Sequence, residues 1–139
     1  MFERILIAVD GSKHSKEAIT RIIELAKESN SEVRVVNVHE LQWGTRSAPL
    51  GTGEEIKEAS DLVADVLAQF AGARVSASGE VRESLSGRIA GEIVAEAADW
   101  GATAIAIGTR GLTDLEGVFT GSVCHRVLHL TKLPVLVIP

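Results

Sequence analysis

Near the start of the chain, residues 5–12 read Ile-Leu-Ile-Ala-Val-Asp-Gly-Ser. Five apolar residues in a row, without the polar alternation of a half-exposed strand, are typical of a β-strand that is buried on both faces. Asp10 and Gly11 end the run abruptly, and Ser12 is a residue type that caps helices. The pattern therefore indicates a strand of a parallel sheet, followed by a helix that Ser12 caps.

The rest of the chain repeats this alternation of apolar runs and helical stripes. Further strands are predicted at Val33–Val38, Arg74–Val81, Thr103–Ile107 and Val135–Ile138. Helices are predicted over residues 18–26, 54–70, 89–97 and 122–131, and Ser86 is the expected cap of the third helix. Strict alternation of this kind predicts an α/β fold, an open five-stranded parallel sheet with right-handed crossovers and helices on both faces. We expect a single domain over residues 1–139.

The composition is that of an ordinary globular protein. Of the 139 residues, 45% are apolar and 24% charged, and a chain of this size buries about two-thirds of its extended surface on folding. The formal net charge of −5 argues against a nucleic-acid-binding protein, which needs a basic surface. The single cysteine excludes an internal disulfide. Since the apolar runs are too short to span a membrane and residues 1–10 do not resemble a signal peptide, we expect a cytoplasmic protein.

Three short segments are the expected places for a ligand. In an open parallel sheet, ligands bind beyond the carboxyl ends of the strands, where the strand order reverses. These segments follow Val9, Val38 and Ile107. The second of them begins the longest predicted connection, His39–Gly53, which contains Trp43. Connections of this length in compact domains are usually functional or mobile.

A glycine-rich pattern follows the predicted fourth strand. Two residues separate Gly108 from Gly111, nine more follow, and Gly121 and Ser122 begin the last helix. Glycine lets the backbone approach a ligand closely, successive peptide N–H groups form anion-binding concavities, and a helix N-terminus attracts negative charge. The pattern favours a phosphate or nucleotide site. In the alternative interpretation, Gly108 ends a strand, Gly111 makes a turn and Ser122 caps a helix, with no ligand involved.

The sequence resembles the universal stress protein family in three features. They are the Gly-x2-Gly-x9-Gly-Ser spacing, the opening residues 5–12 and the closing segment Leu133-Pro134-Val135-Leu136-Val137-Ile138-Pro139. The resemblance runs from Met1 to Pro139 and implies the Rossmann-like fold of the adenine nucleotide alpha hydrolases. The complete glycine spacing is similar to that of the ATP-binding branch. The resemblance also implies a homodimer through Val135–Ile138, which would otherwise leave an unpaired sheet edge.

The resemblance implies a set of cofactor-binding residues, with Mg²⁺ or Mn²⁺ on the phosphates of ATP and no metal held by the protein alone. The set comprises Ala8, Asp10, Val38, Ile107, Gly108, Arg110, Gly111, Gly121, Ser122 and Val123. By resemblance, Asp10 interacts with the adenosine part and Val38 contacts adenine through its main chain. Residues 107–108 border the ribose and the α-phosphate. The last four members hold the phosphates through main-chain N–H groups and the Ser122 hydroxyl. The Arg110 side chain either adds a cation or points to water.

The implied function is that of a nucleotide-dependent regulatory module in a stress response. No catalytic residue is assigned, because phosphoryl transfer needs a group that orients the nucleophile, so at most slow ATP hydrolysis or autophosphorylation on Thr120 or Ser122 is expected. The alternative function is that of a dimeric interaction protein with a vestigial pocket. The chain departs from many family members at Thr103, where they carry an aspartate, and we expect this change to affect a local turn rather than the ligand.

Three residues near the end of the chain are given structural roles. His125 and His129 lie four residues apart on the predicted last helix, opposite Val123 and Val127, so they are predicted to face solvent or a partner. They are not predicted to hold a metal, because a zinc site needs further ligands and none has a suitable spacing. Cys124 is predicted to be a small, partly buried apolar residue, reactive only if the nearby helix N-terminus lowers its pKa.

Overall fold

A computed structural model describes residues 1–41, 53–85, 87–109 and 122–139, with the backbone alone described for Ser122. The described residues form five strands and four helices in strict alternation. In chain order they are β1 (Arg4–Ala8), α1 (Lys13–Ser29), β2 (Glu32–Leu41), α2 (Gly53–Gly72), β3 (Ala77–Leu85), α3 (Ile89–Trp100), β4 (Ala104–Gly108), α4 (Ser122–Leu130) and β5 (Val135–Ile138).

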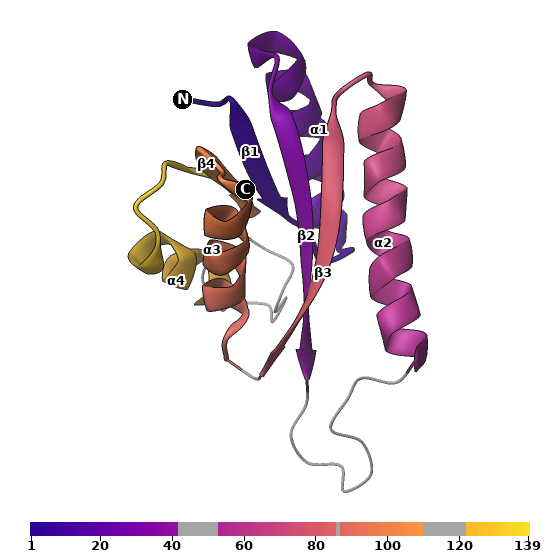
Figure 1. Cartoon of the computed structure of the whole chain (residues 1–139), viewed down its shortest axis with the longest axis vertical. Helices are drawn as coiled ribbons and strands as arrows, with labels where there is room; N and C mark the ends of the chain where they lie inside the picture. The colour runs from indigo at the N-terminus through magenta and orange to yellow at the C-terminus, as the bar shows by residue number, and fades with distance from the viewer. Residues whose placement is uncertain (42–52, 86, 110–121) are drawn as a thin grey trace, which may run out of the picture.

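All strand pairs are parallel, and the strand order is β3-β2-β1-β4-β5. Figure 1 shows β3, β2 and β1 side by side. The chain therefore builds outward from β1 through β2 to β3, and then crosses to the other side of β1 to form β4 and β5. The reversal of direction lies between β1 and β4, which are neighbours in the sheet. The predicted α/β fold with an open five-stranded parallel sheet is confirmed.

Two apolar clusters cover the two faces of the sheet. On one face, Ile5 and Ile7 of β1 pack with the buried residues of α1 and α2. On the other face, Leu6 packs with the buried residues of α3 and α4. The residues from Ile5 to Ile7 have no exposed surface, so the prediction of a strand that is buried on both faces is confirmed.

The predicted bounds of β3 are wrong at both ends. The expected strand was Arg74–Val81, but Arg74 lies in the turn after α2 with a φ of 62°, and the strand spans Ala77–Leu85. Its last residues pair with β2 up to Leu41 and Leu85, so β2 also runs past Val38 and shortens the connection expected from His39. The backbone ladder of an edge strand needs no apolar pattern, and for this reason hydrophobicity did not reveal these residues.

The helix caps agree with the sequence at one position and not at another. Ser12 caps α1, since its side chain accepts a hydrogen bond from the N–H of Ser15 at 3.2 Å. At α3 the cap position belongs to Arg88, whose side chain makes no capping bond, so the prediction for Ser86 is wrong. Ser86 itself lies outside the described residues.

Candidate functional site

The reversal point of the sheet brings together predicted site residues from two strands. Ala8 ends β1, Asp10 follows it, and Ile107 and Gly108 end β4, which pairs directly with β1. Val38 lies on the other neighbour of β1, two residues beyond the Val36 partner of Ala8. Five residues from three segments that are far apart in the sequence therefore share the carboxyl edge of three adjacent strands.

Asp10 organises the turn between β1 and α1. Its Oδ1 accepts a hydrogen bond from the N–H of Ser12 at 2.9 Å, and Ser12 in turn caps the helix. Gly11 has a φ of +82°, a left-handed conformation that favours glycine. The other carboxylate oxygen, Oδ2, is buried and has no hydrogen-bond partner among the described residues. The turn therefore holds an acceptor without a partner among the described residues, in the segment where a ligand is expected.

Asn37 is a residue of this edge that the sequence analysis missed. Its buried side-chain amide donates to the carbonyl oxygen of Val9 at 2.8 Å, and the N–H of Val9 donates to the carbonyl oxygen of Val36 at 2.9 Å. The two bonds extend the attachment of β1 to β2 as far as the residue before Asp10. The only signal in the sequence is that Asn37 interrupts the apolar residues of Val33–Val38, as Arg34 also does.

The end of β4 is attached to β5. Gly108 pairs with Ile138, and the N–H of Thr109 donates to the carbonyl oxygen of Ile138 at 2.9 Å, so this amide belongs to the sheet and not to a ligand. The predicted phosphate residues Arg110, Gly111 and Gly121 lie outside the described residues.

Helix α4 begins at Ser122, as the glycine pattern predicts. The next two residues, Val123 and Cys124, are predicted to contact a phosphate and to be a partly buried apolar residue, respectively. The Val123 side chain is buried against the sheet, which leaves its main chain as the part that can meet a ligand. Cys124 is also buried, and burial raises the pKa of its thiol, so the structure supports its interpretation as an apolar residue without unusual reactivity.

Thr103 has the local role that was expected of it. Its Oγ1 accepts a hydrogen bond from the N–H of Arg4 and donates to the carbonyl oxygen of the same residue, each at 3.1 Å. These bonds join the amino ends of β1 and β4, at the edge opposite Asp10. Trp100, beside them, lies under the Arg4 guanidinium, whose carbon is 4.1 Å from the ring centroid.

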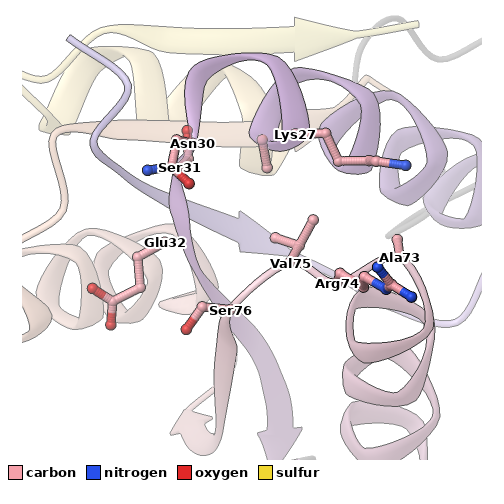
Figure 2. Close-up of a pocket in the computed structure, with 9 residues that line it drawn as sticks. Lys27, Asn30, Ser31, Glu32, Ala73, Arg74, Val75 and Ser76 are labelled. Atoms are coloured by element: carbon pink, nitrogen blue, oxygen red, sulfur yellow. The ribbon is translucent and has the colours of Figure 1, made fainter.

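A cavity of about 640 Å³ lies at the amino edge of the sheet rather than at the predicted site. Figure 2 shows Lys27 and Asn30 on the α1 side of this cavity and Arg74 and Val75 on the side where α2 ends. The last carbonyl groups of both helices point toward this end, and helix C-termini disfavour anions. The cavity is therefore a poor match for phosphate groups, in spite of its two cationic side chains.

The family model described as "Universal stress protein family" matches residues 1–139. The chain belongs to this family. It is 29% identical over 147 residues to universal stress protein YxiE of Bacillus subtilis strain 168, covering 99% of each chain. It is 32% identical to universal stress protein MJ0531 of Methanocaldococcus jannaschii, over 99% of this chain and 82% of that relative.

Solved structures of universal stress proteins share the fold of this one. The structure of a family member from Burkholderia pseudomallei superposes with a TM-score of 0.81 at 24% identity, covering 99% of this chain and 96% of the other. A universal stress protein from Archaeoglobus fulgidus in complex with dAMP gives a TM-score of 0.73 at 25% identity, with both chains covered in full. A universal stress protein in complex with cAMP gives a TM-score of 0.71 at 22% identity, covering 99% of this chain and 97% of the other.

Two further findings concern classes of function. Within residues 1–41, 53–85, 87–109 and 122–139, no helix is long and apolar enough to cross a membrane. Over the same residues, no group of three or more histidine, cysteine, aspartate or glutamate side chains is placed to hold a metal ion.

Proposed function

We propose that this universal stress protein binds an adenine nucleotide, ATP with Mg²⁺ or Mn²⁺, at the carboxyl edge of β1 and β4. The observation that carries the proposal is the buried Oδ2 of Asp10, which has no partner among the described residues. An unsatisfied buried acceptor costs about 1–3 kcal/mol, and more when it is charged. A ribose hydroxyl would supply the missing donor, so the turn fits the adenosine part of a nucleotide.

The surroundings of Asp10 fit the remaining parts of the ligand. Ala8, Val38 and Ile107 would line the adenosine, with Gly108 at the α-phosphate. The phosphates would lie at the start of α4, where Ser122 and Val123 offer main-chain N–H groups and the positive end of the helix dipole. Arg110, Gly111 and Gly121 complete this proposed site. Mg²⁺ or Mn²⁺ needs no protein cage, since phosphate oxygens and water supply most of its ligands.

The dAMP and cAMP complexes of the two similar proteins support an adenine nucleotide as the ligand class. Nucleotide binding would make the protein a regulatory module, because the surface that it presents would depend on nucleotide occupancy. We propose that this module acts in the cytoplasm. The proposal gives no residue a catalytic role. Hydrolysis, or autophosphorylation on Thr120 or Ser122, would at most be slow. The competing function is that of an interaction protein whose pocket is vestigial.

Titration calorimetry of the full chain with Mg-ATP tests the proposal. Asp10→Asn keeps the Oδ1 acceptor for Ser12 but replaces Oδ2 by an N–H donor, so we expect at least about a tenfold loss of affinity. Asp65→Asn makes the same chemical change on the exposed face of α2 and should leave affinity unchanged. Absence of heat and of a thermal shift with the wild type at millimolar nucleotide would favour the vestigial pocket.

A homodimer through β5 is the second part of the proposed function. β5 is an edge strand of the sheet, and its Val137 is 42% exposed. An apolar edge of this kind invites pairing with the same strand of a second copy across a two-fold axis.

Light scattering tests the dimer. The wild type should have the mass of two chains, and Val137→Lys should have the mass of one. The control is Ile56→Lys on α2, because Ile56 is exposed to a similar extent, 43%, and lies far from β5 in the sheet order. A wild type with the mass of one chain would contradict this part of the proposal.

A further inference from the structure

Two histidines form a close pair on the outer face of α4. His125 and His129 are exposed and lie one turn apart, and their Nε2 atoms are 3.2 Å from each other. The two rings meet edge to face, with centroids 4.6 Å apart and an interplanar angle of 73°. The opposite face of the helix is held against the sheet by Val123, Cys124 and Val127, so the backbone that carries the pair is anchored.

The distance between the two nitrogens suits a metal chelate. Imidazole nitrogens bind zinc at about 2.0–2.1 Å, so a separation of 3.2 Å corresponds to an angle of about 100° at the metal. This angle lies close to the tetrahedral value. Both lone pairs can meet at one ion once each ring carries its proton on Nδ1, because the free Nε2 is the ligand atom.

We propose that His125 and His129 form a two-histidine chelating site for a divalent transition-metal ion of the class that prefers imidazole, namely Zn²⁺, Ni²⁺ or Cu²⁺. The ion bridges one turn of α4, and water molecules fill its other coordination positions. Since no third protein ligand is placed to join them among the described residues, binding is weak and readily reversible. Mg²⁺ is not bound here, because it requires oxygen ligands.

The charges around the pair set the strength of binding. A hollow of about 380 Å³ between α3 and α4 is bordered by His129, Glu92, Arg88 and Arg126. Glu92 is paired with Arg82 at 2.9 Å, and Arg126 donates to the carbonyl oxygen of Gly87 at 2.5 Å. The two arginines near His129 oppose a cation, whereas the net charge of −5 on the whole chain attracts one. The ion therefore binds from the open side of the pair, away from the hollow.

The site is independent of the proposed nucleotide site and would be tested without nucleotide. ZnCl₂ is titrated into the full, untagged chain by calorimetry, because an added histidine tag would bind the metal itself. One ion per chain is expected, with no heat from MgCl₂ under the same conditions. The Tm should rise when Zn²⁺ is added and fall back to its metal-free value when EDTA is added, since an ion that bridges one turn binds only the folded helix.

The decisive variant keeps the number of histidines and changes their spacing. The double substitution H129L/L130H moves the second ligand to a position five residues from His125, off the shared face of the helix. Leu130 is 56% exposed, so the exchange disturbs no core contact. We expect at least a tenfold loss of Zn²⁺ affinity and no rise in Tm.

A second variant and a fold control complete the design. His125→Gln should lose Zn²⁺ affinity to the same extent, and far-UV circular dichroism should show that all variants keep the helix content of the wild type. Binding of Zn²⁺ by H129L/L130H within twofold of the wild type would overturn the proposal. Absence of Zn²⁺ binding by the wild type at millimolar metal would overturn it as well.

Discussion

At the amino ends of β1 and β4 most polar groups bond to one another or lie on an aromatic ring, whereas at the carboxyl ends of the same strands a buried carboxylate oxygen, Oδ2 of Asp10, has no hydrogen-bond partner among the described residues. At the amino edge, Thr103 bonds the backbone of Arg4 and the Arg4 side chain donates to the carbonyl oxygen of Trp100 at 2.7 Å. The Nε of Arg4 makes no hydrogen bond in the described chain, but the guanidinium lies over the Trp100 ring, whose π face attracts cations.

We interpret this difference through the proposed function: the amino edge stabilises the fold, and the carboxyl edge is where we propose that a nucleotide binds. At the amino edge the guanidinium of Arg4, whose Nε makes no hydrogen bond among the described residues, is held by the Trp100 ring and the Trp100 carbonyl oxygen. At the carboxyl edge, Oδ1 of Asp10 accepts a hydrogen bond within its own turn, and Oδ2 has no hydrogen-bond partner among the described residues. Substitutions at the amino edge should therefore change stability alone, and substitutions at the carboxyl edge should also change nucleotide affinity.

The largest expected effect is on stability and comes from Phe70 at the amino-edge end of α2. This residue has no exposed surface and packs in the cluster between α1, α2 and the sheet. Phe70→Ala should lower the free energy of unfolding by about 3–5 kcal/mol, because it leaves a cavity in a close-packed core. Urea denaturation measures this loss. The Kd for Mg-ATP, measured on the folded protein, should stay within twofold, and a parallel loss of affinity would break the distinction between the edges.

A smaller effect on stability, joined by an effect on binding, is expected from Asn37 at the carboxyl edge. Asn37→Leu removes the donor to the carbonyl oxygen of Val9 and should cost about 1–3 kcal/mol of unfolding free energy. Because Val9 precedes Asp10, the loss should also displace the carboxylate and weaken Mg-ATP binding severalfold in calorimetry. Unchanged affinity in a destabilised variant would show that the end of β1 does not position Asp10.

The smallest effect is expected from Thr103. Thr103→Val removes the two hydroxyl bonds to Arg4, yet the carbonyl oxygen of Arg4 keeps its bond from the N–H of Thr103 at 2.8 Å. The expected loss is about 1 kcal/mol of unfolding free energy with no change in the Kd for Mg-ATP. Thr103→Ser, which restores the hydroxyl, should regain most of the stability in the same denaturation experiment. Weaker nucleotide binding by Thr103→Val would contradict the division between the edges.

Most of the fold was predictable because burial on both faces leaves a strong pattern in the sequence. The apolar run in β1 is an example, and it marked the strand to within a residue. β3 was placed less well, because it is an edge strand that gains its last residues from backbone pairing with β2 and from ion pairs such as that of Arg82 with Glu96 at 2.9 Å. A segment with charged residues of this kind is predicted as a loop when hydrophobicity is the only criterion.

The candidate site was predictable in outline and not in detail. Asp10 and Gly108 were assigned to it by their places after apolar runs and by resemblance. The contact of Asn37 with Val9 joins residues 28 positions apart, so no local pattern reports it. The spacing of His125 and His129 indicated a shared helix face, and the sequence interpretation rejected a metal there because no further ligand has a suitable spacing. The 3.2 Å between their nitrogens depends on side-chain rotation, which the sequence does not report.

The amino-acid sequence by itself determined the order of strands and helices, the two-sided burial of β1 and the membership of the universal stress protein family, because apolar periodicity and glycine spacing are local properties of the chain. Only the tertiary structure decided which strands are neighbours, and so brought the end of β1 beside the end of β4. It also decided which oxygen of Asp10 is used, because the partners of a buried polar atom come from whatever the packing places within reach.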